Sequence, residues 1–251
     1  MANHEIVLHP FRSSHFNEKA RWALAWKGLE HERVTYLPGP HRGPISKLTG
    51  GATTTPVMAF NGRVTAGSAA IIDALEAAFP DPPLYPADTT ARRQALDLQT
   101  RFDAEVGPAT RTVAFTVFVK ELSYLTRVFA GDGPRLKRLA YRLALPVVRP
   151  IMAKANGVTD PANVAGAFDI TRRTFDQIAE MTTESRFLVG DIFSVADLTA
   201  AALLAPLVSL SHPDMRRPDD VPPAFQRLVA EWKDHPATAW VQAMYRDFRP
   251  A

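Results

Sequence analysis

The sequence contains no cysteine among its 251 residues. This absence excludes disulfide bonds, thiolate metal sites and a cysteine nucleophile in the chain. Any thiol chemistry therefore needs a thiol that arrives with a ligand. The seven histidines show neither HExxH nor another metal-ligand spacing, so we expect no metal site.

Long apolar runs and a large net charge are also missing. No run of about 18 apolar residues occurs, so we expect no membrane-spanning helix. A formal net charge of +3 is too small to indicate a nucleic-acid partner. The opening run MANHEIVLHP lacks the cationic and apolar blocks of a secretory signal. We therefore expect a cytoplasmic protein.

The first part of the chain alternates between strand patterns and helix patterns. Its hydrophobic periodicity predicts strands at residues 5–9, 31–37, 56–61 and 63–67 and helices at residues 16–27 and 68–79. Asn61-Gly62 between the last two strands is a strong hairpin signal. Residues 38–54 are rich in proline and glycine, so we expect them to be mostly loop.

The remainder of the chain has helical periodicity and no convincing strand. Residues 79–90 contain four prolines, which is typical of a linker. The sequence thus predicts an α/β domain over residues 1–80, a proline-rich linker over residues 81–90 and an all-α domain over residues 91–251.

The stretch FRSSHFNEKARWALAWKG, residues 11–28, places two serines directly before a long helical pattern. A serine at this position is ordinarily the N-cap of the helix. It can also serve chemistry, because a helix N-terminus presents unpaired N–H groups and about half a positive charge. A hydroxyl that donates a hydrogen bond there would help to lower the pKa of a bound thiol.

Three further motifs accompany this stretch: TTTPVM, AGSAAIIDALE and FLVGDIFSVADLTAAALLAPL. Together, the four segments resemble the serine-type members of the soluble glutathione S-transferase superfamily. The last contains a capping box formed by Ser194 and Asp197, which is a structural pattern rather than a catalytic one. The resemblance implies a thioredoxin-like N-terminal domain that binds glutathione, an all-helical C-terminal domain with an apolar substrate pocket, and a homodimer.

The resemblance also implies roles for particular residues. Ser14 matches the catalytic serine, with Ser13 as the alternative if the register is shifted by one, and His15 stands where proline is usual. Thr55, before a proline that is cis in the family (Pro56), would pair through its backbone with the cysteinyl part of glutathione.

The motif AGSAAIIDALE departs from the family pattern at Gly67. Ser68 would hold the γ-glutamyl carboxylate at the N-terminus of its helix. Gly67 replaces the acid that normally helps to hold the amino group of glutathione. Asp97 and Asp103 are candidates to supply that acid from the second domain.

Two further sets of residues are candidates for ligand contacts. The glycyl carboxylate of glutathione needs a cation, which His41, Arg42 or Lys47 could supply; otherwise these are solvated loop charges. The apolar run beginning at Arg111 corresponds to helices that wall the second substrate's pocket in the family. Its candidate lining residues are Phe115, Phe118, Tyr124 and Phe129, although an aromatic stripe is more often plain core.

Residues 133–157 hold six lysines and arginines and no acid, interleaved with leucines. We interpret them as a bundle helix with a basic outer face, broken at Pro146 and Pro150. The alternative is a surface helix that contacts an anionic membrane.

These features favour a transferase that conjugates the glutathione thiolate to an apolar electrophile, with glutathione as co-substrate and no metal. Two alternatives stay open. One is a non-catalytic binding protein on the same fold, and the other is a different glutathione-dependent reaction such as isomerisation.

Overall fold

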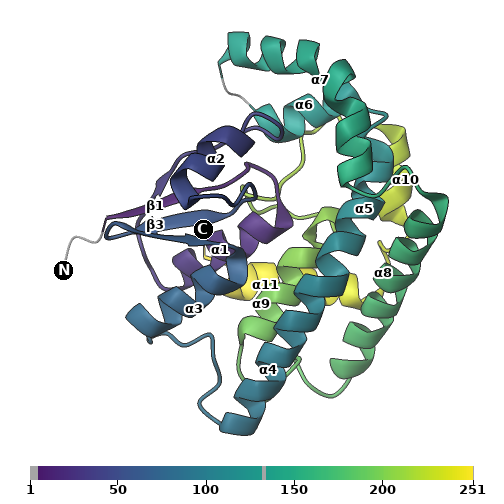
Figure 1. The fold of residues 1–251 in the computed structure, drawn as a ribbon. Coiled ribbons are helices and arrows are strands. Elements are labelled where there is room, and N and C mark those ends of the chain that lie inside the picture. Colours follow the sequence, from purple (N-terminus) through teal and green to yellow (C-terminus); the bar gives the residue numbers. More distant parts are fainter. Residues whose placement is uncertain (1–4, 132–133, 251) are drawn as a thin grey trace.

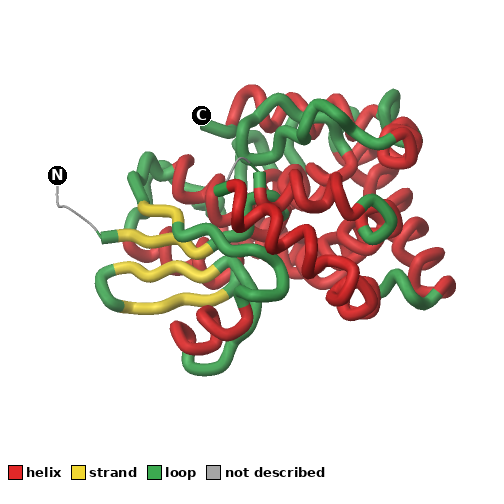
Figure 2. The backbone as a smooth tube through the Cα atoms, turned by 90° about the horizontal axis from the view of Figure 1, so that it is seen from above, coloured by secondary structure: helices red, strands yellow, loops and turns green. Residues whose placement is uncertain are grey.

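The structure, a computed structural model, describes residues 5–131 and 134–250. A four-stranded sheet and its helices form one side of the molecule, and the remaining helices form the other side (Figures 1 and 2). The predicted fold class, a thioredoxin-like α/β region followed by a helical region, is confirmed. Residue 133, the first of the predicted basic segment, lies outside the described residues.

The sheet has the order β2-β1-β3-β4. Its strands are β1 (Ile6–His9), β2 (Glu32–Arg33), β3 (Val57–Phe60) and β4 (Arg63–Ala66), and its helices are α1 (His15–Trp26), α2 (Arg42–Thr49) and α3 (Ser68–Ala78). β1 pairs with β2 in parallel and with β3 antiparallel. The predicted hairpin joins β3 to β4, with φ of 47° at Asn61 and 80° at Gly62, as its turn requires.

The second strand is shorter than the predicted run over residues 31–37. Only Glu32 and Arg33 form a ladder with β1, and a single bridge joins Phe11 to Tyr36. Pro10 follows β1 directly and has no N–H to donate. The parallel pairing is therefore interrupted beyond β1.

The expectation that residues 38–54 are mostly loop missed a helix, because α2 occupies residues 42–49 and the other nine residues are loop or turn. Pro44 stands in the first turn of α2, where the missing N–H is tolerated. Gly50 ends the helix with φ of 74°, the left-handed conformation that favours glycine. Proline and glycine here mark the ends of a short helix, and Ile45 is buried beneath it.

The helical region contains no strand in the part of the chain that the structure describes. Its helices are α4 (Thr89–Arg101), α5 (Gly107–Phe118), α6 (Leu122–Ala130), α7 (Arg135–Ala155), α8 (Pro161–Met181), α9 (Val195–Leu204), α10 (Pro223–Ala230) and α11 (Pro236–Phe248), with a π-helical turn, η1 (Phe102–Val106), and a 3₁₀ turn, η2 (Ala205–Leu207). None of the helices in residues 5–131 and 134–250 combines the length and apolar character needed to cross a bilayer.

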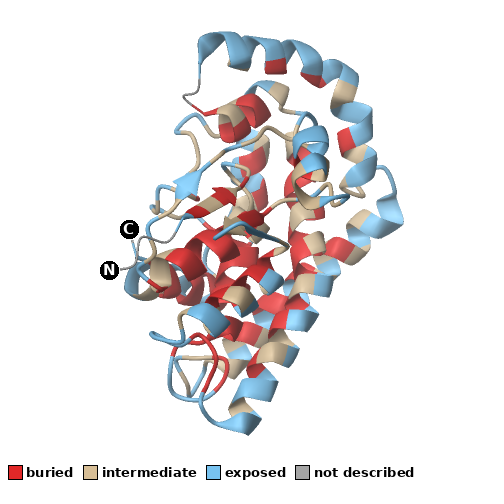
Figure 3. Cartoon of the chain, turned by 60° about the vertical axis from the view of Figure 1, so that its left-hand side comes forward, coloured by how far each residue is buried: buried red, intermediate tan, exposed pale blue. Residues whose placement is uncertain are grey.

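The predicted break at Pro146 and Pro150 is wrong, because α7 continues through both prolines. The helix bends along its length instead (Figure 1), as expected where a proline removes a hydrogen bond from the ladder. α7 lies along the outer edge of the molecule and is mostly exposed (Figure 3).

The first helix is buried between α3 and α9 and carries charged side chains into the core. Lys19 contacts the carboxylate of Asp103 at 2.5 Å. The carboxylate of Glu18 accepts hydrogen bonds from Arg21 and Arg249, each at 2.8 Å. These pairs satisfy buried charges that would otherwise strongly destabilise the fold.

The N-terminus of α1 packs closely against the start of α5. The His15 ring Nε2 lies 2.9 Å from the Gly107 carbonyl oxygen. A Cβ at residue 107 would lie 2.3 Å from the ring of Phe16, so this contact requires glycine. Burial, with Arg111 and Lys19 nearby, lowers the pKa of His15 to about 3. The ring is therefore neutral at physiological pH, and its Nε2–H donates to Gly107.

The capping box at the start of α9 is also buried. Asp197 accepts hydrogen bonds from the backbone N–H groups of Leu188 and Ser194, at 2.8 and 2.9 Å. The Ser194 hydroxyl in turn accepts a bond from the Ala196 N–H. Asp197 thus fixes the loop before α9 as well as the helix end.

We expect Asp197→Ala to lower the free energy of unfolding by about 3 kcal/mol, because it leaves two buried N–H groups without an acceptor. Urea denaturation followed by circular dichroism measures the change. The control is Asp191→Ala, an exposed aspartate in the same loop. Equal stability of the two variants would contradict a structural role for Asp197.

We expect His15 to make stability depend on pH. Its pKa is lower in the folded chain than in the unfolded chain, so the unfolded chain gains a proton first as the pH falls. The stabilisation is complete above about pH 6.5 and is lost as the pH falls towards about 3. His15→Gln keeps an N–H donor for Gly107, and its unfolding free energy should fall less steeply than that of the wild type between about pH 7 and pH 4. Urea denaturation at each pH measures the unfolding free energies of both proteins. If the two free energies fell in parallel as the pH is lowered, this assignment would be contradicted.

Candidate functional site

A cavity of about 770 Å³ lies between the sheet region and the helical region. Its lining residues come from the loop before α1, the start of α2, the segment before β3, the helices α5, α6, α7 and α10, and residues 205–219. This volume is in the usual range for sites that enclose a small molecule.

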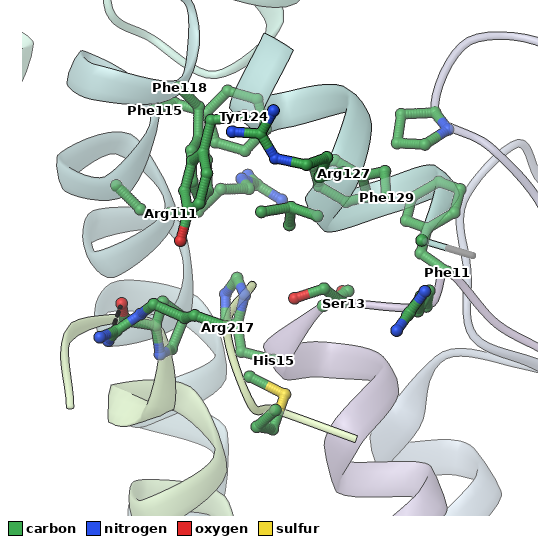
Figure 4. A pocket seen from close by; sticks show the side chains of 18 of the residues that line it. Phe11, Ser13, His15, Arg111, Phe115, Phe118, Tyr124, Arg127, Phe129 and Arg217 are labelled. Atoms are coloured by element: carbon green, nitrogen blue, oxygen red, sulfur yellow. Dashed lines mark hydrogen bonds between the residues drawn. The ribbon is translucent and has the colours of Figure 1, made fainter. Parts of the chain in front are cut away.

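Both candidate serines line this cavity. Ser14 is the N-cap of α1 by position, but its hydroxyl makes no capping hydrogen bond. Within the described residues, the Ser13 hydroxyl has no hydrogen-bond partner either. Figure 4 shows Ser13 at the start of α1, beside His15 and facing the cavity. Both hydroxyls are therefore available to a ligand.

The segment before β3 brings Thr55 to the cavity. The Thr55–Pro56 peptide bond is cis. Asn17 of α1 donates a hydrogen bond to the Thr55 hydroxyl at 3.1 Å, and the Gly67 N–H donates to the Pro56 carbonyl at 2.9 Å. The first turn of α3 is thus fixed next to the Thr55 segment.

Ser68 is the first residue of α3 and is buried. The helical pattern over residues 68–79 also predicts Ser68 as the N-cap of this helix, but this prediction is wrong, because the N-cap is Gly67, with φ of 94°. Pro56, Gly67 and Ser68 are not among the described residues that line the cavity. Of this part of the sheet region, Thr54 and Thr55 reach the cavity wall.

The candidate cations divide into two groups. His41 and Arg42, at the start of α2, line the cavity. Lys47 is exposed in the last turn of the same helix and is not among the described residues that line it. The structure therefore brings two of the three cations to the candidate site.

The two candidate acids occupy different environments. Asp103 binds Lys19 through both carboxylate oxygens, at 2.5 and 2.6 Å, and lies with Ala69 of α3 in a shallow depression. Asp97 is exposed on α4. Asp103 is thus near the start of α3, but its carboxylate already has a partner.

The aromatic candidates form the apolar wall of the cavity. Phe115, Phe118, Tyr124 and Phe129 all line it. Phe225 of α10, to which the sequence did not point, stacks on Phe118 with ring centroids 5.1 Å apart. The hydroxyl of Tyr124 is buried and has no hydrogen-bond partner within the described residues.

Several arginines also line the cavity, and most of them were not predicted from the sequence as site residues. Arg111, Arg127 and Arg217 lie near the aromatic wall (Figure 4). Asp214 and Asp219, the acids on the wall, are already paired with other arginines. A lone cation at the start of an apolar run, as at Arg111, was a visible signal, but its position in a cavity depends on tertiary contacts.

In residues 5–131 and 134–250, no group of three or more histidine, aspartate or glutamate side chains is placed to hold a metal ion. The residues that line the cavity bring hydroxyls, guanidinium groups and aromatic rings to it.

Residues 8–83 match the protein family described as glutathione S-transferase, N-terminal domain. None of the curated protein sequences compared with the chain matches it. Among solved structures, the chain is similar to a glutathione S-transferase from Rhodospirillum rubrum F11, with 21% identity and a TM-score of 0.62, over 96% of this chain and 87% of that chain.

Two further solved structures carry information on ligand and reaction in their names. A glutathione S-transferase from Methylobacillus flagellatus KT with glutathione bound is 17% identical, with a TM-score of 0.61, over 98% of this chain and 100% of that chain. A maleyl pyruvate isomerase, described as a bacterial glutathione S-transferase in the zeta class, is 19% identical, with a TM-score of 0.60. The similarity covers 98% of this chain and 97% of that chain. The chain therefore has the fold of the glutathione S-transferases, and its residues 8–83 match their N-terminal domain.

Proposed function

We propose that the protein is a glutathione-dependent transferase that joins the thiol sulfur of glutathione to an electrophilic carbon of an apolar substrate. The observation that carries this proposal is the pair of uncommitted serine hydroxyls at the N-terminus of α1. They open into a cavity whose opposite wall is aromatic. One side suits a thiolate and the other suits an apolar electrophile.

The chemistry follows from the position of Ser14 at the helix N-terminus. A free thiol has a pKa near 8.5, so little of it is ionised at neutral pH. The unpaired N–H groups of α1 and a hydrogen bond from the Ser14 hydroxyl would stabilise the thiolate and lower its pKa. The sulfur then attacks the electrophilic carbon, and a leaving group departs with its bonding electron pair.

The remainder of the tripeptide extends along the sheet side of the cavity. The backbone of Thr55, which lines the cavity, would pair with the cysteinyl part. The family resemblance gives the γ-glutamyl carboxylate to Ser68 at the start of α3, next to Pro56. Because Ser68 is buried and outside the cavity lining, this contact requires the ligand to reach past Thr55. Because Lys47 lies away from the cavity, we assign the glycyl carboxylate to Arg42 or His41.

Two consequences of this proposal concern the protein in the cell. Reduced glutathione is the thiol that the reaction consumes, so we propose a cytoplasmic location. A homodimer stays a prediction from the family resemblance.

The alternatives to the proposed function are a non-catalytic carrier of apolar ligands and a glutathione-dependent isomerase, and both use the same cavity.

We expect Ser14→Ala to lower kcat/KM by about tenfold or more, because it removes one hydrogen-bond donor to the developing thiolate. Activity is measured with glutathione and 1-chloro-2,4-dinitrobenzene, and the affinity for glutathione by calorimetry should stay within about twofold. Ser123→Ala, on the exposed face of α6, is the control.

The outcomes separate the hypotheses. If Ser13→Ala lowered kcat/KM and Ser14→Ala kept full activity, the catalytic role would belong to Ser13. Glutathione binding without turnover of any electrophile would support the non-catalytic carrier. No binding of glutathione at several millimolar would contradict the proposed function.

A further inference from the structure

The aromatic end of the cavity carries positive charge that no carboxylate of the described chain neutralises. Arg111 is partly buried, and its Nε is fully buried without a hydrogen-bond partner. Within residues 5–131 and 134–250 it forms no ion pair. Burial lowers the pKa of Arg111, so an anionic partner would stabilise its charged form.

Arg217 is in a similar position on the neighbouring wall. Its guanidinium donates to the carbonyl oxygens of Val208 and Pro206, at 2.6 and 3.1 Å, and lies over the ring of Phe225. All of these partners are neutral. Burial lowers the pKa of Arg217 as well.

A third polar group lies at this end of the cavity. The Tyr124 hydroxyl is buried, and it forms no hydrogen bond with the described residues. Burial raises its pKa, so it is a neutral donor. In Figure 4, Arg111, Arg217 and Phe118 lie on one side and Phe11 on the other, with Ser13 between them.

We propose that the second substrate is an aromatic electrophile that carries a carboxylate, bound by Arg111 and Tyr124 with its ring against Phe115 and Phe118. The ring would fill the aromatic wall, and the carboxylate would supply the acceptor that both polar groups lack. This proposal rests on the proposed function, because it names the substrate class of the same cavity.

The test uses two electrophiles of similar shape, one with an anionic carboxylate and one with a neutral carboxamide. In both 4-chloro-3-nitrobenzoate and 4-chloro-3-nitrobenzamide, the sulfur forms a bond to the ring carbon that bears chlorine. Chloride leaves with the bonding pair, and the thiol proton passes to the buffer. After correction for the uncatalysed rates, we expect kcat/KM to favour the benzoate by about tenfold or more.

The variants are Arg111→Met and Tyr124→Phe, neither of which removes a hydrogen bond within the described chain. We expect both to weaken the preference for the benzoate and to leave glutathione affinity unchanged. The control is Arg93→Met, an exposed arginine on α4. A preference that survives Arg111→Met, an equal loss with both electrophiles, or a loss of glutathione affinity would overturn the proposal.

A second measurement does not depend on catalysis. 3-Nitrobenzoate and 3-nitrobenzamide lack the leaving group, and calorimetry measures their binding without glutathione. Tighter binding of the benzoate that disappears in Arg111→Met would support the anion site even in an inactive protein. Equal binding of the two would overturn it, whether or not the transferase reaction occurs.

The outer face of α7 carries an independent inference. Five of its large apolar side chains are between 53 and 78% exposed: Leu136, Leu139, Leu143, Val147 and Ile151. Their spacing of three or four residues places them along one face of the helix. Ile151, at the C-terminal end of this stripe, also lines the edge of the cavity, whereas the other four do not. The face that packs on the protein instead carries Tyr141, Leu145 and Met152.

Basic side chains accompany this exposed apolar stripe. The helix contains no acid, and its cations are Arg135, Lys137, Arg138, Arg142, Arg149 and Lys154. An exposed apolar face flanked by cations is complementary to an anionic lipid surface, where apolar burial and charge attraction act together. We infer that α7 binds the surface of an anionic membrane through this stripe.

Co-sedimentation with lipid vesicles tests this second inference. We expect binding to vesicles of phosphatidylcholine and phosphatidylglycerol, not to phosphatidylcholine alone, and weaker binding at high salt. The double variant Leu139→Ser/Leu143→Ser should bind at least about tenfold more weakly. Ile192→Ser, at another exposed apolar residue, is the control.

Two results would overturn this inference. One is vesicle binding that does not depend on lipid charge or on the two leucines. The other is a change from dimer to monomer in the double variant, measured by light scattering, without vesicle binding by the wild type. In that case, the stripe is an interface with a second copy of the chain.

Discussion

The buried carboxylate of Glu18 lies between the guanidinium groups of Arg21 and Arg249, and the position of α1 depends on this pairing. A buried charge without its partner destabilises a protein by several kcal/mol, roughly 3–5 in measured cases. Arg249 also binds Asp214, which binds Arg33 beside the sheet. One ionic network thus holds the first helix, the edge strand and the 205–219 segment together.

This network also positions the candidate site. The 205–219 segment forms one wall of the cavity, and α1 presents Ser13 and Ser14 on another. Burial alone would raise the pKa of Asp214, but Arg21, Arg33 and Arg249 outweigh burial and hold it below its usual value. Asp214 therefore stays ionised within the network and is not available as an acid or base for the cavity.

Local patterns predicted the elements that local geometry determines. The Asn61-Gly62 turn and the capping box at Ser194 were readable because each depends on residues close in sequence. α2 was missed because its proline and glycine lie at the helix ends, where composition alone resembles a loop. The position of Ser14 was predicted correctly as an N-cap, but the freedom of its hydroxyl depends on the folded backbone.

The charges of the cavity were harder to predict, because a sequence alone does not show which arginines form ion pairs with carboxylates in the folded chain. Arg127 pairs with Asp220 and Arg216 with Asp219, whereas Arg111 has no such partner in the described chain. His15, which replaces the usual proline, is a neutral ring held by Gly107. Its contribution to the site is therefore the placement of α1 rather than charge.

The ion pair of Glu18 and Arg249 joins residues 231 positions apart. A ribosome therefore releases the first helix, in which Arg21 can already pair with Glu18, long before Arg249 exists. Until then, the second oxygen of the Glu18 carboxylate lacks the partner that it has in the folded chain, and the link from α1 through Arg249 to Asp214 is missing. The sheet region should mature late in synthesis, together with the helices that follow it, rather than as an independent early unit.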